Sequence, residues 1–303
     1  MKNIFILLIL LTTVSCMSSG DSKEAKKAKP RNEKVGKVEM VKADLDKYYF
    51  EVNGEELKEA KVPYGCTVRL VLKGLGDFVV KEGKVQCLVS LKLTDKNNQV
   101  ILNEEDLFKN EYPAGMPEEM FGNEMSLTAK FQTPFKINET YKFVGTIKDK
   151  NSESKVVVTE DFLMIPTPGL TYEEKGLSSD GPLLFNTKDT DRALSNNVLN
   201  SGDTLRVYFT GTSGLVQKDS LVWLDASMKL VNEFGDEIMS SPDLYKEYNK
   251  TGMPLSAVKE LVFLKMYFSD VLKSGKKYSA FFTLTDKKDK TKSLSAKYDF
   301  TIK

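Results

Sequence analysis

Apolar and polar residues alternate along several stretches of this chain. Apolar residues take every second position of 68–72 and 205–209, and again of 85–93 and 222–230. A period of two is typical of a β-strand that buries one face and exposes the other. These four stretches are therefore predicted to be strands, with their apolar positions turned toward a core.

The alternating stretches belong to a longer internal repeat. Residues from Gly65 to Lys150 match residues from Gly202 to Lys287 at a constant shift: CTVRLVLKG lies over DTLRVYFTG, and AGMPEE over TGMPLS. Repetition of this kind indicates a duplicated structural unit. We predict two copies of one domain, a first repeat at 41–166 and a second at 172–303, joined near the sequence PTPG. Function is expected where the copies differ.

Other patterns complete the predicted fold of each repeat. Further strands are expected at 125–131 and 156–165, matched by 262–268 and 294–302. The irregular middle of each repeat contains Gly-Met-Pro, where proline suits the first turn of a short helix. About seven short strands and no long amphipathic helix favour an all-β sandwich with a short helical crossover.

One local pattern adds a resemblance. FKINETYKFVGTIKD and LKSGKKYSAFFTLTD each place an apolar residue six positions before a tyrosine, Tyr141 or Tyr278, which alternating apolar positions follow. This resembles the tyrosine corner of immunoglobulin and fibronectin type III sandwiches, in which the hydroxyl bonds to nearby backbone. The resemblance implies two tandem immunoglobulin-like β-sandwiches. An aromatic residue at an ordinary strand start is the alternative, and the Cys-Trp-Cys pattern of antibody domains is absent.

The N-terminus is predicted to carry a targeting signal. MKNIFILLILLTTVSC has one lysine, an apolar run, small residues and a cysteine, as a secretory signal at 1–15 would. The small residues before Cys16 resemble a bacterial lipobox, which implies lipid attached to Cys16, although Thr13 departs from the usual leucine. Secretion with an incidental cysteine is the alternative. Met17 follows the cysteine, rather than the aspartate associated with inner-membrane retention, so the resemblance implies the outer membrane. Which face of that membrane the protein occupies is left open by the sequence. Residues 16–40 are expected to be the lipidated cysteine and a disordered tether.

Two cysteines remain in the body of the chain. Cys87 takes an inward position of a predicted strand, whereas Cys66 follows a turn glycine and takes the place of a charged residue of the second repeat. We expect one buried and one exposed thiol, both free, because such side chains would point apart. A disulfide stays possible, because export favours oxidation.

Composition narrows the function classes. The formal net charge is +1, so nothing indicates nucleic-acid binding, and the chain has no histidine. Asp180, Asp189 and Asp191 are interpreted as solvated loop carboxylates rather than calcium ligands. We expect no enzyme, no cofactor and no metal, and a carboxylate-dependent hydrolase is the least favoured hypothesis.

Outward aromatic residues suggest a binding face in the second repeat. Alternation turns Trp223, Asp225 and Phe281 outward, where the first repeat has smaller or polar side chains at the two aromatic positions. Such residues suit a partner protein or a sugar ring. Cover by another segment, or a one-residue slip of register, is the alternative.

These observations together favour a lipid-anchored, exported bacterial envelope protein. Its expected role is that of a non-catalytic binding or structural module that contacts an envelope protein. The alternative is a glycan-binding surface lipoprotein that uses Trp223, Phe281 and Asp225.

Overall fold

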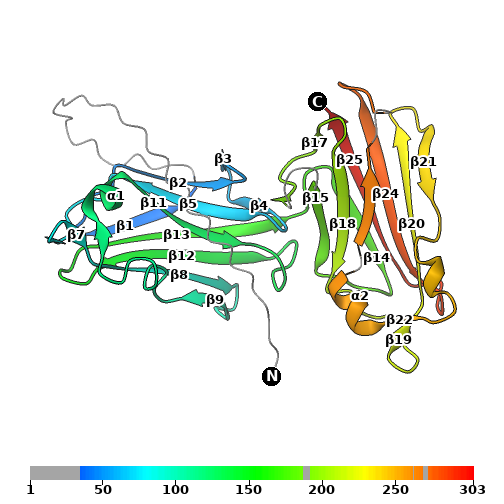
Figure 1. Ribbon diagram of the computed structural model, residues 1–303, viewed down its shortest axis with the longest axis horizontal. Helices are drawn as coiled ribbons and strands as arrows, with labels where there is room; N and C mark the ends of the chain where they lie inside the picture. Colours follow the sequence, from blue (N-terminus) through cyan, green and yellow to red (C-terminus); the bar gives the residue numbers. More distant parts are fainter. Residues whose placement is uncertain (1–34, 187–191, 262, 269–271) are drawn as a thin grey trace.

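A computed structural model describes residues 35–186, 192–261, 263–268 and 272–303 of the 303-residue chain. In this part of the chain, two β-sandwiches lie side by side, each with one short α-helix, and no sheet takes strands from both (Figure 1). The prediction of two all-β sandwiches with a short helix in each crossover is therefore confirmed. Neither helix has the length and apolarity that crossing a bilayer requires.

The first repeat packs one sheet of order β1-β13-β12-β8-β9, with β4 beside β13, against a second of order β11-β5-β2-β3. A small sheet, β10-β7-β6, lies in the crossover with the helix. The elements are β1 Lys37–Val41, β2 Lys47–Val52, β3 Glu55–Glu56, β4 Lys61–Pro63, β5 Thr67–Lys73, β6 Val80–Lys81, β7 Lys84–Val85, β8 Cys87–Asp95, β9 Val100–Glu104, β10 Met116–Pro117, α1 Glu118–Asn123, β11 Glu124–Lys130, β12 Thr140–Asp149 and β13 Lys155–Ile165.

The second repeat has the same plan. Its sheets run β14-β25-β24-β20-β21, with β17 beside β25, and β16-β15-β18-β23, and β19 pairs with β22. The elements are β14 Leu170–Lys175, β15 Gly181–Asn186, β16 Arg192–Ala193, β17 Val198–Leu199, β18 Thr204–Thr210, β19 Leu221–Val222, β20 Leu224–Asn232, β21 Glu237–Ser241, the 3-10 turn η1 Lys246–Tyr248, β22 Met253–Pro254, α2 Leu255–Leu261, β23 Phe263–Tyr267, β24 Lys277–Asp286 and β25 Ser293–Ile302.

The strands of the two repeats correspond closely. β8 and β20, β9 and β21, and β12 and β24 begin and end at matching residues. The last strand departs by one residue: Tyr141 pairs with Phe162, whereas Tyr278 pairs with Phe300, because the preceding turn is one residue longer in the second repeat. The helices begin directly after Pro117 and Pro254, as the sequence predicts.

The N-terminal boundary is a correction. The sequence assigns residues 16–40 to a disordered tether, but Val35 is 2% exposed and β1 begins at Lys37. Most residues of β1 (KVEMV) are exposed, and the strand is held by pairing with β13 rather than by a buried apolar face. The signal peptide and the part of the tether up to residue 34 lie outside the described residues.

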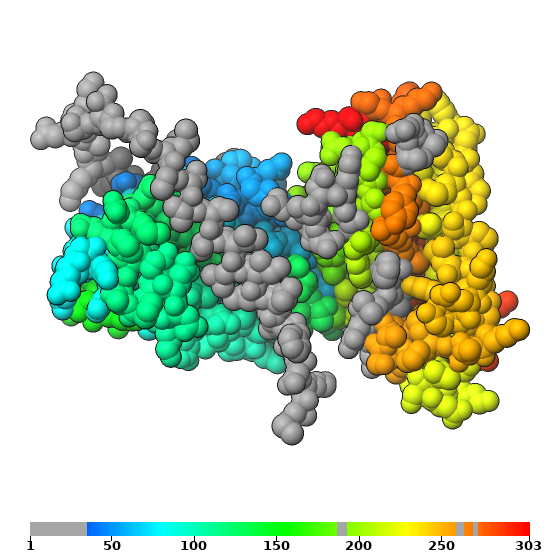
Figure 2. All heavy atoms as spheres, viewed as in Figure 1, coloured from blue at the N-terminus to red at the C-terminus, as the bar shows by residue number. Residues whose placement is uncertain are grey.

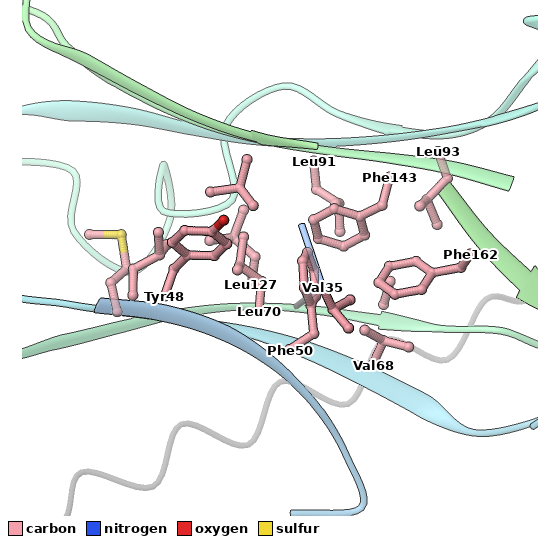
Figure 3. Close-up of a cluster of buried hydrophobic side chains, with 14 of the residues drawn as sticks. Val35, Tyr48, Phe50, Val68, Leu70, Leu91, Leu93, Leu127, Phe143 and Phe162 are labelled. Atoms are coloured by element: carbon pink, nitrogen blue, oxygen red, sulfur yellow. The ribbon is translucent and has the colours of Figure 1, made fainter. Parts of the chain in front are cut away.

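Aromatic side chains fill the core of the first repeat. Phe50 from one sheet meets Phe143 and Phe162 from the other, with ring centroids 5.2 and 5.0 Å away and the rings nearly perpendicular. Figure 3 shows these rings pointing toward one another between the two ribbon layers. Edge-to-face packing of this kind adds to the free energy gained by burial.

The tyrosine corner is present in both repeats. The Tyr141 hydroxyl accepts a hydrogen bond of 2.9 Å from the backbone N–H of Lys136, and the Tyr278 hydroxyl accepts one of 2.9 Å from that of Lys273. Each bond ties the start of β12 or β24 to the loop before it. The expectation from the sequence is therefore confirmed in its geometry.

Side chains of the second repeat complete one end of the first repeat's core. Leu183 and Ala193 pack into that core, and the Asn53 side chain donates a hydrogen bond of 2.9 Å to the Ala193 carbonyl. The Tyr64 hydroxyl lies 3.2 Å from that of Thr133 and 3.0 Å from that of Thr210. We call this contact the joint; it combines apolar burial with hydrogen bonds that fix the two repeats relative to each other.

The joint corrects the prediction for Cys66. This thiol is 1% exposed, because it lies against the carbonyls of Ala193 and Leu194. Cys87 is buried as expected, and both cysteines are free. Burial raises the pKa of Cys66 to about 12 and that of Cys87 to about 11, so both thiols are protonated at neutral pH.

A glycine at the joint gives a first prediction. Gly65 has a φ of +90°, and a Cβ there would overlap the Leu183 side chain. We expect Gly65→Ala to cost about 1–3 kcal/mol through backbone strain and to separate the repeats as well. Small-angle scattering of the variant should show a broader distribution of molecular dimensions.

Gly83→Ala is the matched control for the joint. Gly83 also has a positive φ, of +71°, but a Cβ there would meet no atom within 4 Å. This variant should lose stability without changing the scattering curve. Equal scattering changes in both variants would show that the contact between Gly65 and Leu183 does not hold the repeats together.

Candidate functional site

The candidate residues lie on the outward side of the sheet β14-β25-β24-β20-β21, which we call the outer face. β20 and β24 are neighbours, as expected, and Asp225 and Phe281 project outward from them while Ala226 and Phe282 are buried. Figure 2 shows the hairpin β20–β21, in yellow, at the side of the molecule away from the first repeat. The predicted outward register is therefore correct.

Trp223 lies between β19 and β20 and is half-buried. Its ring rests on Gly252, where a Cβ would come within 3.0 Å of two ring atoms, and the Lys288 ammonium lies 4.3 Å from the ring centroid. The indole is thus placed against the Gly-Met-Pro segment, and a cation lies over its ring.

Trp223 and Phe281 do not form one site. Trp223 bonds through its carbonyl to the N–H of Lys287, whereas Phe281 stands opposite Lys229. Six residues of strand separate these two positions, which corresponds to about 20 Å. The two aromatic residues share a face but cannot contact the same small ligand.

Asp225 stays near Trp223 and apart from Phe281. It pairs with Thr285 across the sheet. Its Oδ1 atom is enclosed and accepts no hydrogen bond within the described residues. A carboxylate oxygen of this kind is poorly placed to reach a sugar hydroxyl from the strand surface.

A shallow hollow of about 360 Å³ opens beside Phe281 instead. It is lined by Ser227, Met228, Lys229, Ser240, Ser241, Pro242, Phe281 and Thr283, from β20, β21, β24 and the residue after β21. The lining combines one aromatic ring, hydroxyl groups and an ammonium group. We call it the Phe281 hollow.

Two lysines flank the Phe281 ring. The ammonium groups of Lys229 and Lys297 lie 5.6 and 5.9 Å from the ring centroid. Lys297 also forms an ion pair of 2.8 Å with Asp299. Simple alternation turns Lys229 outward, but its place beside Phe281, like that of Lys297, depends on strand pairing, which the sequence alone does not give.

A second hollow, of about 100 Å³, lies in the first repeat at the place that corresponds to Trp223. Gln86, Cys87, Tyr112 and Lys150 are among its lining residues, and the Lys150 ammonium forms an ion pair of 3.0 Å with Asp106. Since burial keeps the Cys87 thiol protonated, this hollow has no activated nucleophile.

The loop carboxylates have separate positions. Asp180 lies at the joint, where its Oδ2 accepts a hydrogen bond of 3.3 Å from Thr133, and burial raises its pKa. Asp189 and Asp191 lie outside the described residues. In the part of the chain that the structure describes, no three His, Cys, Asp or Glu side chains gather as they would around a metal ion.

Comparison with known proteins gives distant likenesses. No family model matches this chain, and no curated protein matches it. Among solved structures, the chain is similar to a calcium-binding mutant of Bacteroides uniformis beta-glucuronidase 2, with 9% identity and a TM-score of 0.25, over 88% of this chain and 32% of that chain. It is also similar to a protein named pT26-6p, with 10% identity and a TM-score of 0.23, over 84% of this chain and 63% of that chain. The chain thus spans less than two thirds of either structure.

Proposed function

We propose that this chain is a non-catalytic binding module of a bacterial cell envelope, anchored by lipid on Cys16, whose second repeat contacts a partner protein. The proposal is supported above all by exposed aromatic residues that the second repeat has and the first repeat lacks. Phe234 is 80% exposed at the tip of the hairpin β20–β21, and Tyr267 is 62% exposed at the end of the edge strand β23.

The fold does not need these two side chains. The first repeat forms the same hairpin with Asn97, and the same edge strand with Lys130, at the corresponding positions. Aromatic side chains are enriched at protein interfaces, where burying one contributes much of the binding energy. Their exposure at a hairpin tip and a sheet edge suits a protein surface better than a small ligand.

Site-specific crosslinking tests the proposal. A photoreactive amino acid at Phe234 or Tyr267 of the full chain should give one crosslinked product of defined mass in intact cells, and the same group at Asn97 or Lys130 should not. Phe234→Ser should then weaken the purified pair by about tenfold or more. Equal products from all four positions, or none from the second repeat, would contradict the proposal.

The anchor has its own test. Palmitate should label the full chain in cells, and Cys16→Ala should lose the label and release the protein from the membrane fraction. Labelling that persists in Cys16→Ala would contradict lipidation at this residue and leave the partner surface unaffected.

A second candidate function is glycan binding, and the Phe281 hollow favours it. Its ring can stack on the C–H face of a sugar while the hydroxyls of Ser227 and Thr283 hydrogen-bond to sugar hydroxyls. This candidate uses Phe281 without Trp223, because about 20 Å of strand lies between them.

A further inference from the structure

The lining of the Phe281 hollow includes one charged side chain, the cation Lys229, which a neutral sugar would not use. Lys297 is paired with Asp299, but no carboxylate forms an ion pair with Lys229 among the residues that the structure describes. The Lys229 side chain is exposed and lies on the rim of the hollow. Its charge is thus available to a ligand that rests on the ring.

The polar groups of the hollow lie within one small patch. Ser227 and Thr283 pair across β20 and β24, and Lys229 pairs with Phe281 on one side and Ser240 on the other. Facing residues on one side of a sheet are about 5 Å apart, so a single six-membered ring can reach several of them. Ser240 also lines the hollow, and because its hydroxyl donates to Glu237, its oxygen can still accept a hydrogen bond.

The first repeat shows what has been added at this place. Strand pairing sets Lys92, Val144 and Thr159 where the second repeat has Lys229, Phe281 and Lys297. The first lysine is common to both repeats, while the aromatic ring and the second lysine belong to the second repeat alone. Since both repeats fold, neither addition is required by the sandwich.

We propose that the Phe281 hollow binds a carboxylate-bearing sugar, a uronic acid unit of an acidic glycan. The sugar's C–H face rests on Phe281, its carboxylate accepts hydrogen bonds from the Lys229 ammonium in the field of Lys297, and Ser227 and Thr283 contact its hydroxyls. This inference rests on the second candidate function and narrows it to acidic glycans.

An acidic glycan fits the aromatic ring, the hydroxyl groups and the Lys229 charge of the hollow together. A neutral sugar would use the ring and the hydroxyls but leave the Lys229 charge without a counterion. An acidic peptide would supply a counterion for Lys229, yet it has no rigid C–H face for Phe281. Both are outcomes of the test below.

The test is calorimetric titration of the full chain with a tetramer of galacturonic acid, its methyl ester and a tetramer of galactose. The acid should bind about tenfold more tightly than the ester or the neutral tetramer. Added salt should weaken binding of the acid and leave the neutral ligands unaffected, because the contact is ionic and partly exposed.

Variants drawn from the first repeat identify the site. Phe281→Val and Lys297→Thr replace each residue by its counterpart in the first repeat, so both variants should fold. Lys229→Gln removes the ammonium charge on the rim of the hollow. Phe281→Val and Lys229→Gln should each weaken binding of the acid by about tenfold. Lys92→Gln, at the counterpart of Lys229, is the matched control and should bind as the parent does.

The remaining outcomes distinguish failure of the acidic-glycan inference from failure of glycan binding itself. Equal binding of acid and ester, lost in Phe281→Val, would overturn the acidic class and keep glycan binding. Loss in Trp223→Ala but not in Phe281→Val would overturn the hollow as the site. No binding of any sugar, or binding of polyglutamate with the same dependence on Lys229, would overturn both the acidic-glycan inference and glycan binding.

Discussion

Replacing Phe162 by alanine is expected to lower the free energy of unfolding of the first repeat by about 3–5 kcal/mol. The ring is fully buried, and it lies 5.0 Å from Phe50, 5.9 Å from Phe131 and 6.1 Å from Phe143 between centroids. The alanine variant lacks a ring that packs against both sheets, and a cavity remains in its place. Because β13 is hydrogen-bonded to strands on both of its sides, it cannot move inward to fill that cavity. Urea unfolding followed by circular dichroism measures the loss.

The single tryptophan makes this experiment sharper. Trp223 belongs to the second repeat, so its fluorescence follows that repeat, whereas circular dichroism follows both. In Phe162→Ala, the dichroism transition should move to lower urea more than the fluorescence transition does. The size of the smaller shift measures coupling across the joint.

Two comparisons can contradict the expectation. Phe162→Leu keeps most of the apolar volume and should lose less than half as much stability, because the remaining cavity is smaller. A loss below about 1 kcal/mol in Phe162→Ala would mean that the core of the first repeat rearranges freely around this position.

The sequence predicts the sandwich well because the sheets are buried on one face only. Because one face is buried, apolar residues take every second position in β5, β8, β12 and their counterparts. The duplication repeats this pattern in both halves of the chain. The tyrosine corner adds a specific bond, which both repeats form. Local periodicity thus carries most of the fold.

Features that depend on distant contacts do not show in the pattern. Cys66 follows a turn glycine and looks exposed from its neighbours, but Ala193 and Leu194 of the other repeat cover it. β1 is held mainly by backbone pairing with β13, and its five residues, KVEMV, are too short a run to stand out from the tether before it. Neither fact could be obtained without knowing which segments meet.

The candidate site shows the same limit. Alternation gives the correct face for Trp223 and Phe281, since a period of two settles which side each residue takes. The distance between them depends on the register of β20 against β24, two strands that are far apart in the sequence and that no single turn joins. For that reason, the pairing of Phe281 with Lys229 and Lys297 cannot be predicted from the sequence alone.

A pair of buried aspartates leads to the second large expected effect. Asp149 ends β12, is 1% exposed, and accepts hydrogen bonds from the N–H groups of Val79 and Asn151, at 2.7 and 2.8 Å. We expect Asp149→Ala to cost about 3 kcal/mol, because it leaves two backbone donors without their charged acceptor. Urea unfolding at pH 7 measures the loss.

Asp286 in the second repeat allows an internal replicate. It is fully buried at the end of β24 and accepts from the N–H groups of Val216 and Lys288, at 2.6 and 2.8 Å. Asp286→Ala should therefore shift the fluorescence transition of Trp223, whereas Asp149→Ala should chiefly shift the dichroism transition. Asp161→Ala, an exposed site on β13, is the control and should change neither by more than about 0.5 kcal/mol.

The Asp149 contribution should also depend on pH, in a direction set by its pKa. Burial raises that pKa, but the hydrogen bonds from Val79, Asn151 and the Ser152 hydroxyl outweigh burial, so the pKa lies below its ordinary value in the folded chain. A lowered folded pKa means that this stability is present above the unfolded pKa of about 4 and is lost as pH falls through the folded pKa. Asp149→Asn should therefore lose stability relative to the parent at pH 7, and this difference should shrink below pH 4. A difference that stays constant from pH 7 to pH 3 would show that the charge of Asp149 does not hold the loop at Val79.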